Sequence, residues 1–312
     1  MNISAGIVAI SHRDPAQEPD LDQLNHALAG IKTLSWQNLD KQYISPLAPE
    51  EGQQEGPAYW LVTARCSYAE SLPDLRHRLA QLSQEKQLGL SLNAVAFSGQ
   101  EAQQKKLLVM DVDSTLIQEE VIDLLALKAG KGAEVAQVTE RAMRGELDFA
   151  QSLTSRVSQL AGLPLSLLEQ VSQEITLSPG AQQLIQGLQA EGHVVAAVSG
   201  GFEQILTPLA TRLKLAYSRA NQLEVEAGLL TGRVSGAIVT AEVKEEMLRL
   251  WAEKENLTLA DTVAVGDGAN DLLMLKQAGL GIAFCAKPAL RKAADARLDL
   301  PRLDAVGHFM NP

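Results

Sequence analysis

Leu107-Leu108-Val109-Met110-Asp111-Val112-Asp113-Ser114-Thr115 is the stretch of sequence that decides the fold of this chain. Its first four residues are an apolar run that predicts a buried strand, and two acids follow at the carboxyl end of that strand. Ligands of open α/β sheets bind outside the carboxyl ends of the strands. Two carboxylates two residues apart on extended backbone point the same way. The pair could therefore supply a nucleophile, a metal site and a proton donor together.

Strand and helix patterns alternate through the last part of the chain. We expect strands at 194–198, 262–265 and 281–284, and helices at 202–213, 243–255 and 271–277. A further helix is expected to open at 178–180, with Ser178 as its cap and Pro179 in its first position, and to end at Gly192. This alternation predicts an α/β fold with a parallel sheet flanked by helices. The segment 221–239 interrupts it with a hairpin pattern around Ala227-Gly228.

Two other regions have a different organisation. In residues 1–102, expected strands at 59–64 and 90–97 and a helix that starts at Ser71 predict a small α+β domain. The polar segment 98–106 is the expected linker to a second domain, at 103–312. Between about 118 and 176 only helical periodicity is present, beginning with 115–129. An all-helical insertion is expected there.

Composition limits the classes of function. The 312 residues are 46% hydrophobic and 21% charged, as in soluble globular proteins. The net charge of −11 argues against a nucleic-acid partner, and it means that local cations must meet any anionic substrate. Cys66 and Cys285 are too few for a disulfide framework, which favours a reducing, cytoplasmic setting. With no apolar run of transmembrane length and no basic segment at the start, we expect no membrane partner.

Polar residues also follow the other expected strands. Ser199-Gly200-Gly201 follow 194–198, Gly266 to Asp271 follow 262–265, and Lys244 lies in the first turn of a helix. Taken singly, each has an ordinary structural explanation as a turn or a solvated charge. Their joint occurrence with the Asp111 and Asp113 pair, in this order, is much harder to explain by chance.

The combination resembles the haloacid dehalogenase superfamily of phosphatases that form an aspartyl phosphate, over roughly residues 105–300. Within that superfamily it is most similar to enzymes that act on O-phosphoserine. That similarity rests on Asp-x-Asp-Ser-Thr followed by Glu120, on Arg-Ala-Met-Arg-Gly-Glu-Leu-Asp-Phe at 141–149 with Arg156 beyond, and on Gly-Asp-Gly-Ala-Asn-Asp at 266–271. The resemblance implies a Rossmann-like parallel sheet with a helical cap. It also implies hydrolysis of O-phospho-L-serine to L-serine and phosphate, the last step of serine biosynthesis.

The resemblance assigns roles to the core residues. Asp111 would be the nucleophile and Asp113 the general acid and base. Mg²⁺ would be held by the Asp111 carboxylate, the Asp113 carbonyl and Asp267, with Asp271 orienting these ligands. The groups that would contact the phosphate are Ser199, Gly200, Gly201, Lys244 and Asn270.

The helical insertion would close over the sheet as a cap. The resemblance assigns Glu120 to the substrate ammonium group and Arg156 to its carboxylate, which a guanidinium binds well. Met143 and Phe149 would seal the pocket from water.

Other readings stay open. The same chemistry would serve phosphohomoserine, another small phosphate ester, or transfer to an amino-alcohol acceptor, because one methylene changes discrimination by only about 1–3 kcal/mol. An alternative that is not an enzyme is a signalling domain that holds phosphate on Asp111. Asp113 argues against it, because its position suits rapid hydrolysis of the phosphorylated aspartate. Residues 1–102 resemble small modules of amino-acid enzymes such as the ACT domain. They could bind serine, form a homodimer or steady the catalytic domain.

Overall fold

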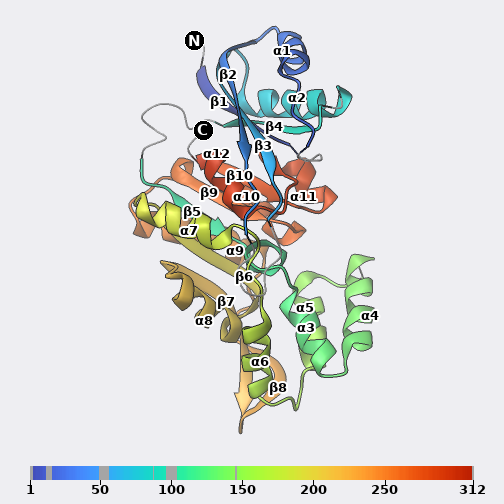
Figure 1. The fold of residues 1–312 in the computed structure, drawn as a ribbon. Coiled ribbons are helices and arrows are strands. Elements are labelled where there is room, and N and C mark those ends of the chain that lie inside the picture. Colours follow the sequence, from blue (N-terminus) through green and yellow to red (C-terminus); the bar gives the residue numbers. More distant parts are fainter. Residues whose placement is uncertain are drawn as a thin grey trace.

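The computed structural model describes residues 3–11, 16–48, 56–86, 88–95, 104–144 and 146–310, without the side chains of residues 3, 4, 38, 84 and 143. It contains two sheets, and the larger one carries the Asp111 segment (Figure 1). The order of its seven strands is β11(Ala296–Leu298), β10(Leu280–Phe284), β9(Thr262–Gly266), β5(Leu107–Met110), β6(Val194–Phe202), β7(Tyr217–Glu226) and β8(Leu229–Ser235). All neighbours pair in parallel except β7 with β8. The strand that ends at Asp111 is therefore central, with β9 and β6 on its two sides.

Helices cover both faces of this sheet, as the alternation of strand and helix patterns predicts. Leu108 and Met110 of β5 pack in one core and Leu107 and Val109 in another, because successive side chains of a strand point to opposite faces. The first core includes helices α7(Ala181–Ala190), α8(Glu203–Leu213) and α12(Gly307–Met310). The second includes α9(Ala241–Lys254), α10(Leu272–Gln277) and α11(Pro288–Ala293). Burial on both faces explains why β5 is a continuous apolar run.

The hairpin expected within 221–239 is present as β7 and β8. Ala227 and Gly228 connect the two strands with φ of 50° and 80°. Two consecutive residues with positive φ are the arrangement that twists correctly into an antiparallel pair.

The insertion between β5 and α7 is helical, as expected. It consists of α3(Val121–Lys128), α4(Gly132–Met143), α5(Phe149–Ser158) and α6(Ser166–Glu174). Helices α3 to α5 stand beside the sheet at the lower right of Figure 1. Ile117 and Leu177 form an isolated antiparallel bridge where the chain leaves the sheet and returns. The insertion is thus tied at its base and extends over the carboxyl end of β5.

Two helix starts differ from the expected positions. The periodicity at 115–129 predicts a helix from Thr115, but α3 begins only at Val121, after a tight turn in which Ser114 has φ of 56°. Ser178 and Pro179 do not open α7. The chain reaches the helix through Gly180 at φ of 81°, and the Ser178 hydroxyl donates to the Thr115 carbonyl instead. In both places tertiary contacts around the Asp111 turn outweigh local preferences. The end of α7 at Gly192 is as expected.

The N-terminal part is a β-α-β-β-α-β unit with an antiparallel sheet of order β2-β3-β1-β4. Its elements are β1(Ile3–Ser11), α1(Leu21–Ala29), β2(Leu34–Ile44), β3(Tyr59–Tyr68), α2(Leu72–Glu85) and β4(Leu90–Val95). The strands at β3 and β4 and the helix capped by Ser71 were expected. The sequence pattern did not predict β1, α1 and β2. The expected domain boundary at 102–103 and residues 98–103 of the linker lie outside the described residues.

The two sheets meet through polar contacts. The side-chain amide of Asn93 in β4 accepts from the backbone N–H of Arg297 in β11 at 2.8 Å and donates to the Arg297 carbonyl at 3.2 Å. Arg302, buried at 1% exposure, donates to the Ser45 and Pro57 carbonyls and lies over the Tyr59 ring. These contacts fix the N-terminal unit against the edge of the larger sheet.

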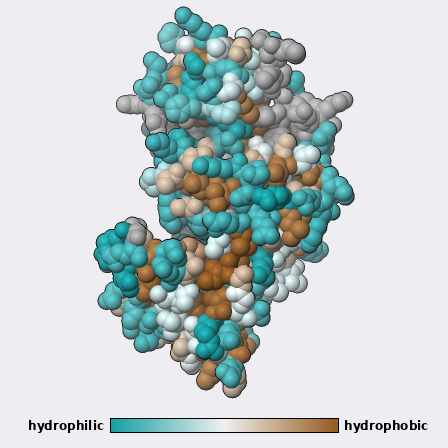
Figure 2. Space-filling model, turned by 180° about the vertical axis from the view of Figure 1, so that it is seen from behind, coloured by the Kyte–Doolittle hydropathy of each residue, from teal (hydrophilic) through white to brown (hydrophobic). Residues whose placement is uncertain are grey.

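The opposite face of the molecule is mostly hydrophilic in its upper part, and its broadest apolar area lies in the lower half, beside the helical cap (Figure 2). None of the helices in the described residues is both long enough and apolar enough to span a membrane.

Candidate active site

A buried lysine joins two carboxylates at the carboxyl edge of the larger sheet. Lys244 Nζ donates to Asp111 Oδ1 at 2.6 Å and to Asp271 Oδ1 at 2.7 Å, and Lys244 and Asp271 are each 0% exposed. Asp111 directly follows β5, Asp271 precedes α10, and Lys244 lies in the first turn of α9. Burial alone would remove charge from these groups, so the mutual pairing is what keeps the cation stable there. The two neighbouring carboxylates raise the Lys244 pKa despite its burial.

Three carboxylates gather at this point in the spacing of a metal site. Ligand oxygens of Asp111, Asp267 and Asp271 lie within 4.8 Å of one another, and all three residues are buried. The loop from β9 makes this possible, since Asp271 Oδ2 accepts from the backbone N–H of Gly268 at 3.0 Å. A Cβ on Gly266 would lie 2.4 Å from Asp271 Cγ, so only glycine fits there. A donor set made only of oxygen fits a hard divalent cation.

Asp113 is bound on both of its oxygens. Oδ1 accepts from the backbone N–H of Val121 at 2.9 Å, and Oδ2 accepts from the Ser199 hydroxyl at 2.9 Å. The Ser199 oxygen in turn accepts from the backbone N–H of Gly201 at 2.7 Å. A Cβ on Gly201 would lie 2.8 Å from Asp113 Oδ2, which explains the glycine. The carboxyl ends of β5 and β6 are thereby joined around Asp113.

Burial dominates the electrostatics of both acids in the Asp-x-Asp motif. Desolvation raises the pKa of Asp113, and the hydrogen bonds from Val121 and Ser199 oppose the rise. Desolvation also raises the pKa of Asp111; the Asp271 charge adds to that rise and Lys244 opposes it. A carboxyl group whose pKa is raised holds its proton to higher pH, as a general acid must.

A cavity of about 310 Å³ lies between Asp111 and Asp113 on one side and residues of the helical cap on the other. The ring of Phe149 in α5 packs directly against Gly200. A Cβ at position 200 would lie only 2.7 Å from that ring, so the contact requires glycine. Glu120 accepts from the Ser114 hydroxyl at 3.1 Å, and burial is the main cause that raises its pKa. Arg156 Nε is buried and finds no hydrogen-bond partner among the described residues. On the side of the cap, the cavity is therefore lined by the acid Glu120 and by Arg156, whose Nε has no hydrogen-bond partner among the described residues.

Most of the residues predicted from the sequence meet at this cavity. Its lining includes Asp111, Asp113, Glu120, Phe149, Arg156, Gly200, Gly201, Asp267 and Asn270. Ser199 and Lys244 donate to the lining acids Asp113 and Asp111, and Asp271 accepts a second hydrogen bond from Lys244. Met143 ends α4, but its side chain lies outside the described residues, so its predicted sealing role stays a prediction.

Sequence reasoning missed Lys287, which also lines the cavity. Its Nζ lies 3.5 Å from Asp267 Oδ2, and the Asp267 and Glu120 charges raise its pKa against burial. Lys287 comes three residues after β10, so its place after a strand of the same parallel sheet was the signal that could have found it. The cavity is also lined by Ile122, Asp123, Thr139, Leu153 and Phe202, which were not predicted.

The comparisons with known proteins agree with this geometry. Residues 108–276, more than half of the chain, match the family model for haloacid dehalogenase-like hydrolase, and the chain belongs to this family of hydrolases. Relatives include the phosphoserine phosphatase of Streptococcus thermophilus, 54% identical over 202 residues that cover 65% of this chain and 94% of that protein. The phosphoserine phosphatase of Streptomyces coelicolor is 50% identical over 75% of this chain but only 57% of its own length.

One solved structure extends the likeness to nearly the whole chain. It is a probable phosphoserine phosphatase from Vibrio cholerae, with 33% identity and a TM-score of 0.72 over 98% of this chain and 86% of that one. The likeness therefore includes most of the N-terminal unit as well as the hydrolase part.

Proposed function

We propose that this chain is a phosphoserine phosphatase, which hydrolyses O-phospho-L-serine to L-serine and phosphate as the last step of serine biosynthesis. One observation carries the proposal: the cavity that holds the Asp111 and Asp113 pair is faced by Glu120 and Arg156. An acid and a guanidinium match the ammonium and carboxylate of an amino-acid phosphate. The names of the relatives from two bacterial genera support the same substrate.

The first half-reaction would transfer the phosphoryl group to the enzyme. A carboxylate oxygen of Asp111 forms a bond to phosphorus, and the bond from phosphorus to the serine oxygen breaks. Asp113 gives its proton to that leaving oxygen, so free serine departs. Lys244 holds the other part of the Asp111 carboxylate in place and balances the charge that gathers on the phosphoryl oxygens.

The second half-reaction would release phosphate. Asp113, now ionised, takes a proton from water while the water oxygen bonds to phosphorus, and the bond from phosphorus to Asp111 breaks. Ser199, the amides of Gly200 and Gly201, and Asn270 are the proposed phosphate contacts. Phe149 and Met143 would exclude bulk water until this step.

We propose Mg²⁺ as the metal, held by Asp111, the Asp113 carbonyl and Asp267, with Asp271 orienting these ligands from behind. The support is the all-oxygen donor set of the acidic trio. Bound there, Mg²⁺ would supply positive charge to the phosphoryl oxygens and lower the repulsion between substrate and carboxylates.

Phosphate release from L-phosphoserine, phosphohomoserine and p-nitrophenyl phosphate, each with and without Mg²⁺, tests the proposal. We expect Mg²⁺-dependent release and a clear preference for phosphoserine. Equal or better turnover of the other two esters would keep the catalytic core but reject the substrate. No release from any of them would contradict the proposed function altogether.

We further propose that residues 1–102 form a separate domain and that 103–312 form the phosphatase domain, with the cap at about 118–176. A homodimer is proposed through the N-terminal sheet, because β2 is a terminal strand of that sheet. Sedimentation analysis of the full chain would decide the oligomeric state. The two free thiols, Cys66 and Cys285, support the proposal of a reducing, cytoplasmic setting.

A further inference from the structure

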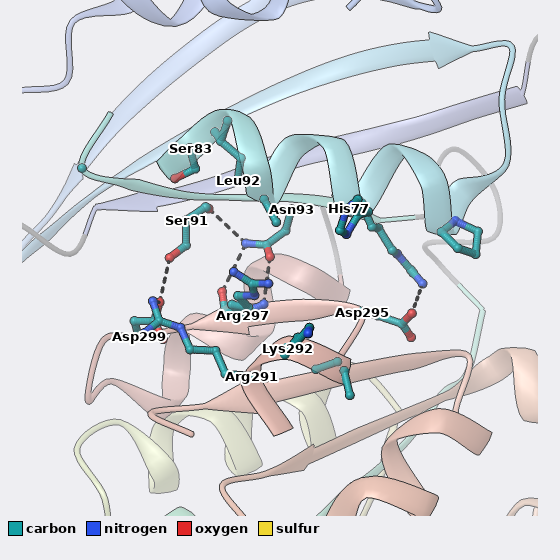
Figure 3. A pocket seen from close by; sticks show the side chains of 16 residues that line it. His77, Ser83, Ser91, Leu92, Asn93, Arg291, Lys292, Asp295, Arg297 and Asp299 are labelled. Atoms are coloured by element: carbon teal, nitrogen blue, oxygen red, sulfur yellow. Dashed lines mark hydrogen bonds and ion pairs between the residues drawn. The ribbon is translucent and has the colours of Figure 1, made fainter. Parts of the chain in front are cut away.

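A second cavity lies between the N-terminal unit and the hydrolase part, away from the acidic trio. Its volume is about 520 Å³, which lies within the range of small-molecule sites. One wall is formed by α2 and β4 and the other by α11, β11 and the residues that flank β11. Figure 3 shows Ser91 and Asn93 on one side facing Arg297 and Asp299 on the other. We call this space the interdomain cleft.

The interdomain cleft is positively charged, although the whole chain carries −11. Its lining contains the cations Arg76, Arg291, Lys292 and Arg297 but only two carboxylates, Asp295 and Asp299. A concave site with an excess of one sign of charge concentrates ligands of the opposite sign. The local charge therefore favours an anion.

The two carboxylates are already engaged. Asp295 pairs with Arg76, and Asp299 accepts from Arg291 at 2.6 Å and from the Ser91 hydroxyl at 3.3 Å. The structure shows no ion pair to the side chains of Lys292 or Arg297 within the part of the chain it describes. Neither cation therefore forms an ion pair in the described part of the chain, although the Asp299 charge acts on Arg297.

Of the two cations without an ion pair, Lys292 is exposed to solvent and Arg297 is partly desolvated. The Arg297 side chain is half-buried; desolvation and then the nearby Arg291 charge lower its pKa, and the Asp299 charge opposes them. Arg76 Nη2, on a side chain with 10% exposure, is likewise buried with no hydrogen-bond partner among the described residues. Partly desolvated guanidinium groups without full pairing lower stability unless a ligand completes them.

Helix α11 connects the interdomain cleft with the catalytic cavity. Lys287 immediately precedes this six-residue helix and lines the catalytic cavity, whereas Arg291 and Lys292 in its last turn line the cleft. A ligand bound to those cations would bear on the same short helix that positions Lys287. This placement suits an effector.

We propose that the interdomain cleft binds a small dianionic metabolite, which carries either two carboxylates or a phosphate group, through Arg297 and Lys292. The ligand would pair with the half-buried Arg297 and the exposed Lys292, beside the Arg76–Asp295 and Arg291–Asp299 pairs that also line the cleft. The inference does not depend on which phosphate ester the catalytic cavity hydrolyses.

Calorimetric titration of the full chain with bound Mg²⁺ tests the proposal, with succinate and inorganic phosphate as the two probes. The test variant is Lys292→Gln with Arg297→Gln. The control is Arg249→Gln with Lys276→Gln, which removes the same charge from two exposed positions outside both cavities. Phosphate that binds in the catalytic cavity is common to all three proteins, so the comparison isolates the cleft.

We expect the wild type and the control to bind one of the probes in the cleft and the test variant to bind it at least ~10-fold more weakly. Loss of succinate binding would identify a dicarboxylate ligand, and loss of one of two phosphate sites would identify a phosphate-bearing ligand. The proposal fails if neither probe binds in the cleft or if the test variant binds both as the wild type does. Because Arg297 lacks an ion pair, the test variant should melt at the same temperature as the wild type or higher, which separates lost binding from misfolding.

Discussion

Ser199 donates a hydrogen bond to Asp113 Oδ2 at 2.9 Å, which joins the carboxyl ends of two neighbouring parallel strands. The bond favours the ionised form of Asp113, whereas burial favours the neutral form and prevails. The proposed reaction needs both forms in turn, first the acid and then the base. In the proposed reaction Ser199, together with the Val121 N–H, would therefore influence the balance between the two half-reactions.

Replacing Ser199 by Ala should raise the pKa of Asp113 further, because a bond that stabilises the charged carboxylate is lost. Transfer of the phosphoryl group to the enzyme needs protonated Asp113, so the alkaline limb of the kcat/KM profile should move to higher pH. Loss of a phosphate donor should also reduce kcat by about 10²-fold. Ser199→Thr, which keeps the hydroxyl, should restore the wild-type profile. An unchanged alkaline limb in Ser199→Ala would contradict the pairing argument.

Asp111→Asn should reduce turnover by at least ~10³-fold, because the amide cannot form the phosphoryl ester. Lys244 still has Asp271 as a partner in this variant, so the fold should persist. Phosphate release and acid-quenched labelling of the protein with phosphate measure the two consequences. Full activity or a labelled Asp111→Asn protein would exclude Asp111 as the nucleophile.

Lys244→Met should make stability depend on the metal. Without Lys244, two buried carboxylates face each other with no cation, which should lower the free energy of unfolding by about 3–5 kcal/mol in chelator. Mg²⁺ binds the folded acidic trio and should recover part of this loss by mass action. Urea unfolding with and without Mg²⁺ would measure both effects. If Mg²⁺ stabilises neither the wild type nor Lys244→Met, the trio is not the metal site.

Arg156→Ala should separate substrate recognition from catalysis. Loss of a charged hydrogen bond to the substrate carboxylate should raise KM for phosphoserine by ~10- to 100-fold. Turnover of p-nitrophenyl phosphate, which has no carboxylate, should change little. The matched control is Arg144→Ala, an exposed arginine at the end of α4 on the same cap. Equal loss with both substrates would show that Arg156 has another role.

His308 should make the fold sensitive to acid. Its Nε2 lies 2.8 Å from the Tyr59 hydroxyl, and burial lowers its pKa, an effect that Asp304 opposes and Arg302 assists. Because the unfolded chain then binds the proton more tightly, this contribution is present above the ordinary pKa of 6.5 and is lost as the pH falls below it. The stability difference between wild type and His308→Gln should therefore shrink from pH 7.5 to 5.5. The exposed His26→Gln serves as control, and a constant difference would rule out this titration.

The sequence predicted the central strands β5, β6, β9 and β10 of the larger sheet well, because they are buried on both faces and begin as apolar runs. It did not predict the short strand β11. The core of the candidate site followed from the same signal, since its polar residues come directly after those runs. Glu120 and Arg156 could be found only through the family resemblance, because charged residues on helices usually face solvent. Lys287 was missed because two residues separate it from its strand and no motif marks it.

The N-terminal unit was harder to predict for a physical reason. In β2 more buried and exposed residues alternate over 34–37 and again over 39–42, but the phase of the alternation changes where the pairing with β3 shifts, between Gln37 and Asp40. Such a strand has no strict period of two, and propensity is a weak guide where tertiary pairing decides. The start of α3 was misplaced because Ser114 takes a left-handed conformation that periodicity cannot reveal.

The Asn93 amide that pairs with the Arg297 backbone has a consequence for colloidal behaviour. Strands β4 and β11 are each the last strand of their sheet, and the open backbone of a terminal strand is a template on which other chains can polymerise. Here the Asn93 side-chain amide forms the two hydrogen bonds with Arg297 that the backbone of an added strand would form. Each terminal strand therefore blocks strand addition to the other. Separation of the two parts would uncover both templates at once. The N-terminal unit thus protects its neighbour from aggregation simply by remaining attached.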